Sequence, residues 1–183
     1  RHSVRVAEYS VLIAQKLGLS EQECENLRKA ALLHDIGKIG IADKVLNKPA
    51  KLDDEEYAIM KSHVMRGAEI LKDFTLVDHV IDGVKYHHER YDGTGYADGL
   101  KGDESPLYGR IIGVADAFDA MTSNRVYRNK LDIETVLNEL ERCKGTQFDP
   151  VIDDIIQELI RNKEIDIDAL YQNNEDTKGE ESE

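Results

Sequence analysis

Cysteine, proline and tryptophan are scarce in this sequence of 183 residues, which contains two, three and none of them respectively. Cys24 and Cys143 are far apart and lack metal-ligand spacing, which argues against both a disulfide framework and a thiolate metal site. We interpret them as free thiols of a reducing compartment that lie outside the functional site. A cytoplasmic location is therefore expected.

Regular strand-like alternation is also nearly absent, while apolar residues recur at helical spacing throughout the chain. The sequence therefore predicts an all-α fold, and its length fits one well-packed domain better than two. We expect a single-domain helical bundle over residues 1–163. The acidic extension over 164–183 is expected to be mobile from about residue 173.

Positive charge is in deficit, because 24 Lys and Arg face 37 Asp and Glu, a net charge of −13. This balance argues against a DNA- or RNA-binding surface, which needs a basic face. It leaves room for a small anionic ligand, since bound cations and a few arginines set the local field. No apolar run reaches the roughly 20 residues of a membrane span, and there is no signal peptide. The chain starts without methionine inside a helical pattern, so we expect an excised domain.

Caps and turn residues mark the expected helices. Ser20 with Glu23, and Asp53 with Glu56, are capping-box pairs at helix starts. The helices are expected over residues 4–17, 20–35, 53–72 (with a kink near its middle), 76–86, 107–123, 132–143 and 149–162. Residues 40–49 are expected to form a loop. Residues 90–105 carry dense turn signals, and a loop this long in a helical domain is usually functional.

His34 and Asp35 end the second predicted helix, with Gly37 expected at its C′ position. A neighbouring histidine and aspartate at the inner end of a buried helix are costly to desolvate unless a metal ion binds them. Adjacent helical residues point about 100° apart, so the pair suits two ions if Asp35 bridges them. Alternatively, His34 is favoured by the helix dipole and Asp35 acts as a local cap.

Further histidines and an aspartate favour the metal interpretation. His87 and His88 follow a helix directly, and Asp116 lies in an apolar helix, where it would otherwise be an exposed carboxylate near Asp119. His79 stands apart and is expected to be an ordinary surface histidine. Imidazole and carboxylate ligands without thiolates suit Fe, Mn, Zn or a similar ion. The candidate ligands are His2, His34, Asp35, His63, His87, His88 and Asp116.

Cations near these ligands suit a phosphate substrate. Lys38 follows the His34–Asp35 pair, and Arg125 and Arg128 lie three residues apart after the helix that carries Asp116. An arginine fork matches phosphate oxygens, although such a pair is commonly solvated surface. Two ions about 3.5–4 Å apart generate a hydroxide and clamp a phosphoryl group. We expect hydrolysis of a phosphate ester, with Lys38 neutralising phosphate charge or protonating the leaving oxygen.

Four blocks of sequence resemble the HD-GYP phosphodiesterases, a bacterial subgroup of the HD metal-dependent phosphohydrolases. The blocks are HDIGKIGI (34–41), HHERYDGTGY (87–96), RIIGVADAFDAMTS (110–123) and GTQFDP (145–150). The resemblance runs from His2 to about Leu159. It implies a helical bundle with two or three divalent ions, often iron. It also implies hydrolysis of cyclic di-GMP to pGpG, and in some members to GMP.

The resemblance assigns metal-ligand roles to the seven candidates above, with Asp35 as the bridge. It implies that Asp35 and Lys38 act in catalysis, that Lys38, Arg125 and Arg128 contact phosphate, and that Gly95 and Tyr96 lie at the substrate. A fused sensory or receiver domain is expected in the parent protein, and a homodimer is among the expected assemblies. The family's usual proline is replaced at Ala97, and likewise at Ala42 and Val126, which affects loop stiffness more than metal chemistry.

Two other functions are open at this point. The chain could be an HD-type hydrolase of nucleotide monophosphates or alarmones. It could also be a non-catalytic signalling module whose altered loop at 95–97 binds a protein, although a docking surface needs no buried His/Asp cluster.

Overall fold

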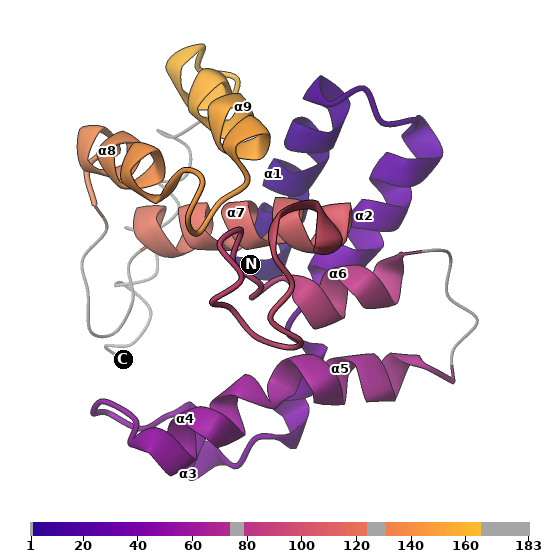
Figure 1. Cartoon of the computed structure of the whole chain (residues 1–183), viewed down its shortest axis with the longest axis vertical. Helices are drawn as coiled ribbons and strands as arrows, with labels where there is room; N and C mark the ends of the chain where they lie inside the picture. Colours follow the sequence, from indigo (N-terminus) through magenta and orange to yellow (C-terminus); the bar gives the residue numbers. More distant parts are fainter. Residues whose placement is uncertain (1, 74–78, 124–130, 166–183) are drawn as a thin grey trace, which may run out of the picture.

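The computed structural model describes residues 2–73, 79–123 and 131–165, and these ranges are helical, as the sequence predicts (Figure 1). The α-helices are α1 (His2–Lys16), α2 (Glu21–Leu33), α3 (Asp43–Leu46), α4 (Asp54–Lys61), α5 (His63–Leu71), α6 (Val80–Tyr86), α7 (Leu107–Thr122), α8 (Ile133–Cys143) and α9 (Pro150–Arg161). Two short 3-10 helices are η1 (Ile36–Gly40) and η2 (Gly102–Glu104). Within the described ranges, no helix is long and apolar enough to span a membrane.

The helices form two layers joined by α6. Helices α1, α2, α7, α8 and α9 surround the main core, in which Ile13, Leu27, Phe118 and Ile156 are fully buried. Helix α6 packs against α2 and α7 on one side and against α5 on the other. Helices α3, α4 and α5 lie below it, and the long loop after α6 lies at the centre of the molecule (Figure 1). This arrangement brings η1, α5, α6 and α7 together around one point.

The predicted caps are present. Both capping boxes form, at Ser20 with Glu23 and at Asp53 with Glu56. The Asp132 side chain accepts from the Thr135 N–H at the start of α8. Asp149 caps α9 with Pro150 at its first position, where the missing N–H costs no helical hydrogen bond. These local signals explain why the starts of α2, α4, α8 and α9 were predictable.

Three segments differ from the prediction. The helix expected over 53–72 is interrupted at Ser62, whose hydroxyl donates to the Ile59 carbonyl, and α5 starts afresh at His63. The expected loop over 40–49 contains α3, and η1 precedes it. The helix expected from residue 76 is seen from Val80 onward, and residues 74–78 lie outside the described ranges. The proposed boundary at residue 163 remains a prediction.

Gly37 is not a left-handed C′ residue, so that prediction is wrong. Helix α2 ends at Leu33, and Gly37 is a buried part of η1 with no positive φ. A Cβ at Gly37 would lie 1.9 Å from the His63 carbonyl oxygen and 2.5 Å from the Gly67 backbone nitrogen. Glycine is therefore required here because η1 and α5 touch through their backbones. This contact sets the distance between Asp35 and His63.

We expect Gly37→Ala to lower the free energy of unfolding by about 3 kcal/mol or more, because both backbones must move to admit the methyl group. Urea denaturation would measure the change. Gly40→Ala is the matched control in the same helix, since its Cβ would meet only the Arg66 side chain, which can rotate away. Equal stabilities of the two variants would contradict the contact.

Candidate metal centre

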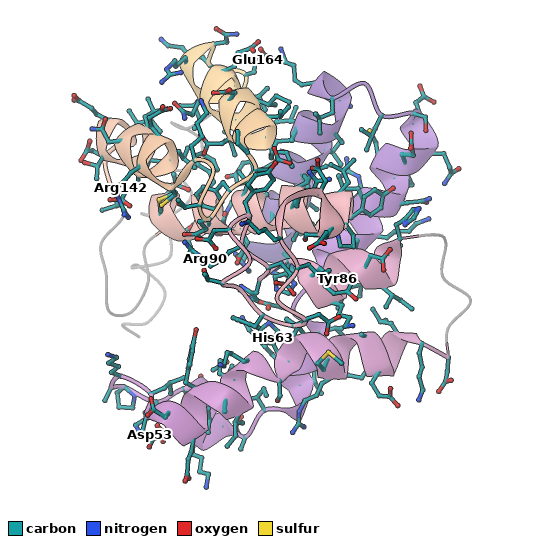
Figure 2. The ribbon with its side chains drawn as sticks, viewed as in Figure 1. Asp53, His63, Tyr86, Arg90, Arg142 and Glu164 are labelled. Carbon is teal, nitrogen blue, oxygen red and sulfur yellow. The ribbon has the colours of Figure 1, made fainter. Side chains whose placement is uncertain are left out.

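The predicted ligands come together from five parts of the chain. His2 begins α1, His34 and Asp35 follow α2, His63 begins α5, His87 and His88 follow α6, and Asp116 lies within α7. Figure 2 shows His63 at the start of α5, on the side that faces the loop after α6. Their ligand atoms form overlapping groups in which all atoms lie within 4.8 Å of one another. These groups are His63–His87–His88, His2–His34–Asp116 and His34–Asp35–His87.

Three of the histidines share one hydrogen-bonding pattern. The Nδ1 atoms of His34, His63 and His87 lie 2.6, 2.7 and 2.9 Å from the carbonyl oxygens of the residues three positions earlier. Each carbonyl fixes the tautomer with hydrogen on Nδ1 and leaves a lone pair on Nε2. All three Nε2 atoms are buried and have no hydrogen-bond partner. Because buried polar atoms are nearly always paired, this donor set fits metal ions.

Asp35 lies between two groups of histidines. Its Oδ2 is 3.5 Å from His34 Nε2 and 4.0 Å from His2 Nε2. Its Oδ1 is 3.5 Å from His63 Nε2 and 4.0 Å from His87 Nε2. The two oxygens therefore face different imidazoles, as a carboxylate shared by two ions would. Asp35 makes no side-chain capping hydrogen bond, so the alternative of a local cap is not supported.

His2 is oriented by two residues that sequence reasoning missed. Its Nδ1 is 2.7 Å from Asp119 Oδ2, while its Nε2 is 3.3 Å from Asp116 Oδ1. Arg5 donates to both Asp119 oxygens, from Nε at 2.6 Å and Nη2 at 3.0 Å. The sequence held one signal for them. Arg5 follows His2 by three residues and Asp119 follows Asp116 by three, so each shares a helix face with a candidate ligand.

The electrostatics favour the protonation states that bind metals. Burial lowers the pKa of His63, places that of His87 well below its ordinary value, and lowers that of His88 to about 4. Burial opposes ionisation of Asp35, but the adjacent His34 ring and the Lys38 ammonium, which donates to Oδ2, outweigh it and hold the pKa of Asp35 well below its usual range. At neutral pH these imidazoles are neutral and the carboxylate is ionised.

His2 and Asp116 form the exception to this pattern. Hydrogen bonds to Asp116 and Asp119 raise the pKa of His2 to about 9. The pKa of Asp116 is held low, because its hydrogen bond from His2 and the nearby histidines outweigh burial. A metal ion at this end of the cluster must therefore displace a proton from His2.

The predicted substrate residues are placed only in part. Lys38 donates to Asp35 Oδ2 at 2.6 Å, so its ammonium lies beside the cluster. Tyr96 stacks on His88 with ring centroids 4.9 Å apart. Gly95 lies against the backbone of 88–90, where a Cβ would be 2.4 Å from the Arg90 nitrogen. Arg125 and Arg128 lie outside the described residues. Substrate contact by these residues remains a prediction.

Glu89 holds the loop that carries Tyr96. Its Oε1 accepts from the backbone N–H groups of Ala97, Asp98 and Gly99, at 3.2, 2.7 and 2.9 Å. The first of these donors exists because residue 97 is not proline. The family's usual proline is thus replaced by a hydrogen bond to a carboxylate, which gives the loop another source of stiffness.

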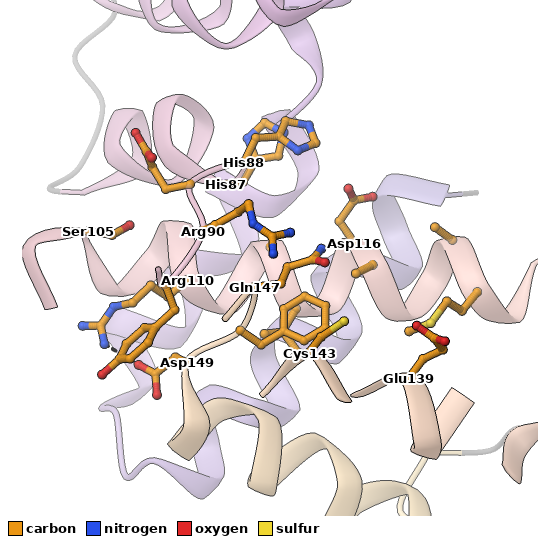
Figure 3. A pocket seen from close by; sticks show the side chains of 18 of the residues that line it. His87, His88, Arg90, Ser105, Arg110, Asp116, Glu139, Cys143, Gln147 and Asp149 are labelled. Atoms are coloured by element: carbon orange, nitrogen blue, oxygen red, sulfur yellow. Dashed lines mark hydrogen bonds and ion pairs between the residues drawn. The ribbon is translucent and has the colours of Figure 1, made fainter. Parts of the chain in front are cut away.

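A cavity of about 360 Å³ adjoins the cluster (Figure 3). His88 and Asp116 line both, and Arg90, Gln147 and Phe148 line the cavity wall. Neither cysteine belongs to the groups of ligand atoms, although Cys143 lines the cavity. The turn at Gly145, with φ of +74°, returns the chain from α8 toward this wall.

We expect Asp35→Asn to abolish tight binding of two divalent ions per chain, because a neutral amide bridges ions poorly. Titration with Mn²⁺ followed by electron paramagnetic resonance would count bound ions. Asp103→Asn is the control, since this exposed aspartate lies on η2 away from the cluster. Two tightly bound ions in Asp35→Asn would contradict the bridging arrangement.

Removing the Glu89 carboxylate should loosen the loop without emptying the metal centre. We expect Glu89→Ala to speed hydrogen exchange of the amides at 97–99 by about tenfold or more, since hydrogen bonds to charged groups contribute about 1.5–3 kcal/mol. Glu104→Ala is the matched control, because Glu104 accepts one N–H, from Lys101, in the same loop. Unchanged exchange at 97–99 would show that Glu89 does not hold the loop.

Comparison with known proteins supports this interpretation. The family model described as "HD domain" matches residues 1–152. A cyclic di-GMP phosphodiesterase of Thermotoga maritima is 41% identical over 179 residues, which are 97% of this chain and 48% of that protein. The cyclic di-GMP phosphodiesterase response regulator RpfG of Xanthomonas campestris is 45% identical over 150 residues, 80% of this chain and 39% of that protein. A 3′3′-cGAMP-specific phosphodiesterase of Vibrio cholerae is 40% identical over 159 residues, 86% of this chain and 30% of that protein. The chain thus spans less than half the length of these relatives.

Solved structures share the fold at lower sequence identity. A cyclic GMP-AMP phosphodiesterase of V. cholerae (V-cGAP3) matches with a TM-score of 0.70 and 24% identity, covering 88% of this chain and 44% of that one. Bd1817 of Bdellovibrio bacteriovorus, described as an HDG"Y"P protein, matches with a TM-score of 0.70 and 22% identity, covering 87% and 51%. At these identities the likeness concerns the fold.

Proposed function

The chain belongs to the HD domain family, and from that premise we propose that it is a metal-dependent phosphodiesterase that hydrolyses cyclic di-GMP to pGpG, GMP or both. The observation that carries the proposal is the set of buried, unpartnered Nε2 atoms of His34, His63 and His87 around Asp35. The names of the relatives supply the substrate class. Within that class, the choice of cyclic di-GMP as the substrate comes from the resemblance in the blocks at 34–41 and 87–96.

Two divalent ions fit the donor atoms on either side of Asp35. One group of ligands would be His2, His34 and Asp116, and the other would be His63, His87 and His88, with Asp35 shared. Iron is the metal that we propose, and manganese suits the same nitrogen and oxygen donors. When bound, such ions polarise phosphoryl oxygens and lower the pKa of water.

The protein's own residues position and neutralise the substrate phosphate. Lys38 now donates to Asp35, and this ammonium can turn to a phosphate oxygen close by. We propose that it offsets the charge that develops on the phosphoryl group and protonates the leaving oxygen. Arg125 and Arg128 are proposed to hold phosphate oxygens, and Tyr96, stacked on His88, to border the substrate. We further propose that residues 1–163 act in the cytoplasm as one module of a longer protein with a sensory or receiver domain.

The test is turnover of a nucleotide panel by anaerobically prepared protein loaded with Fe²⁺ or Mn²⁺. We expect conversion of cyclic di-GMP to pGpG or GMP. We also expect Lys38→Ala to lower kcat/KM by about 10²–10³-fold while bound metal is retained, as for loss of one preorganised electrostatic contact. Lys44→Ala, an exposed lysine on α3, is the matched control.

Hydrolysis of nucleotide monophosphates without cyclic dinucleotides would replace the proposal with another HD-type phosphohydrolase. Tight nucleotide binding without turnover in fully metal-loaded protein would indicate a signalling module. Full activity of Lys38→Ala would contradict only the proposed role of this lysine and would leave the rest of the proposed function unaffected.

A further inference from the structure

The cavity beside the metal centre is a preformed pocket with an apolar strip on one wall and polar side chains around it. Val114, Ala117 and Met121 of α7 line it at helical spacing, which gives an apolar strip roughly 10 Å long at 1.5 Å per residue. Phe148 adds an aromatic ring that is 5% exposed. Small-molecule sites combine apolar surface with placed polar groups in a volume of roughly 300–1,000 Å³, a range that includes the 360 Å³ found here.

Two of the segments that supply polar groups to the pocket are hydrogen-bonded to each other. The Tyr91 N–H donates to the Gln147 carbonyl at 3.2 Å, and the Asp92 N–H donates to the Thr146 carbonyl at 2.8 Å. These bonds fix the segment of Arg90 against that of Gln147. Figure 3 shows the Arg90 guanidinium and the Gln147 amide reaching toward the same space near Asp116. The pocket walls are therefore set before any ligand arrives.

Arg90 presents a free pair of donors. Its Nε donates to Thr94 Oγ1 at 3.0 Å, which anchors the side chain. Within the described parts of the chain, its two Nη groups have no hydrogen-bond partner, and neither has the side-chain amide of Gln147. A planar arginine fork matches two adjacent acceptors, and in guanine these are O6 and N7. Adenine offers a donor in place of O6, which would face the guanidinium donors.

We propose that this cavity binds one guanine base of the substrate, with Arg90 donating to O6 and N7 and the apolar strip of α7 covering the base face. The inference rests on the proposed function, because His88 and Asp116 border both the metal centre and the cavity. A phosphate at the metal centre would thus place its own nucleoside beside the pocket. Gln147, whose amide both donates and accepts, suits the remaining base edge without choosing between purines. Arg90 is then the residue that separates guanine from adenine, a choice that matters among relatives named for cyclic di-GMP and for 3′3′-cGAMP.

The test measures binding of GMP and AMP by isothermal titration calorimetry, both with Mn²⁺ and in EDTA. The two nucleotides carry the same phosphate, so the ratio of their Kd values reports the contribution of the base to binding. For the unaltered protein we expect GMP to bind about tenfold more tightly than AMP, the usual scale for one bidentate base contact. We expect Arg90→Gln to weaken the binding of GMP about tenfold. The binding of AMP should be unchanged or tighter, since glutamine pairs with adenine N6 and N7.

Two further variants separate the base contact from charge and folding. Arg90→Lys keeps the charge but loses the fork, so the preference for GMP should fall several-fold while AMP binding is unchanged. Arg28→Gln makes the same change of residue at a position on α2 where the side chain is 42% exposed, and it should leave both Kd values unchanged. Melting temperatures identify a variant that fails to fold, in which case Arg90→Lys provides the test.

If Arg90→Gln weakens the binding of GMP and AMP equally, Arg90 contacts the phosphate that the two nucleotides share, and the proposal is overturned. Equal binding of the two nucleotides by the unaltered protein would overturn it as well, even if cyclic di-GMP is hydrolysed. Preference for GMP without turnover of any cyclic dinucleotide would leave the base site standing and overturn the proposed function instead.

Discussion

The site depends on one repeated interaction, in which an imidazole at a helix end bonds through Nδ1 to a carbonyl three residues earlier. His34, His63 and His87 all do this, so the same small device orients three rings toward one point. Their unpartnered Nε2 atoms would be costly to bury in a site that stayed without metal. The folded state without metal therefore carries the free-energy cost of these buried, unpaired nitrogen atoms, and cation binding would offset that cost. Metal binding and stability of the folded state should be linked for this reason.

Close backbone contacts convert those local orientations into a common centre. Gly37 lets η1 lie directly on α5, and Gly95 lets the loop return onto the backbone of 88–90. Asp35 is then shared between histidines from two layers of the fold, with each carboxylate oxygen facing a different set. Arg5 and Asp119 extend the same principle to His2, whose ring would otherwise be held only at the first residue of α1. Outer partners of this kind commonly fix the geometry of metal ligands.

The sequence predicted what depends on local chemistry, and it missed what depends on distant contacts. The all-α fold and the resemblance to HD-GYP proteins are confirmed, and the capping pairs at Ser20 and Asp53 form as expected. Gly37 was misinterpreted because a glycine after a helix usually serves as a cap, whereas here α5, a neighbour in space, imposes the requirement. The Asp119–Arg5 pair joins residues 114 positions apart, and no spacing rule links Arg90 with Gln147. The division of the chain at residue 163 and the roles of Arg125 and Arg128 remain predictions.

A chain with a net charge of −13 can still favour an anionic dinucleotide, because electrostatic attraction at the site is local. Exposed charges beyond about 8 Å are largely screened at physiological ionic strength. Within that range the substrate would meet Lys38, Arg90 and two divalent ions, whose charge exceeds that of Asp35 and Asp116. Without metal, the charge of Asp35 is already balanced by Lys38, and that of Asp116 by His2, which carries a proton between Asp116 and Asp119. Two divalent ions would add a large positive charge at one point, so phosphate binding should be coupled to metal loading and not to the overall charge of the protein.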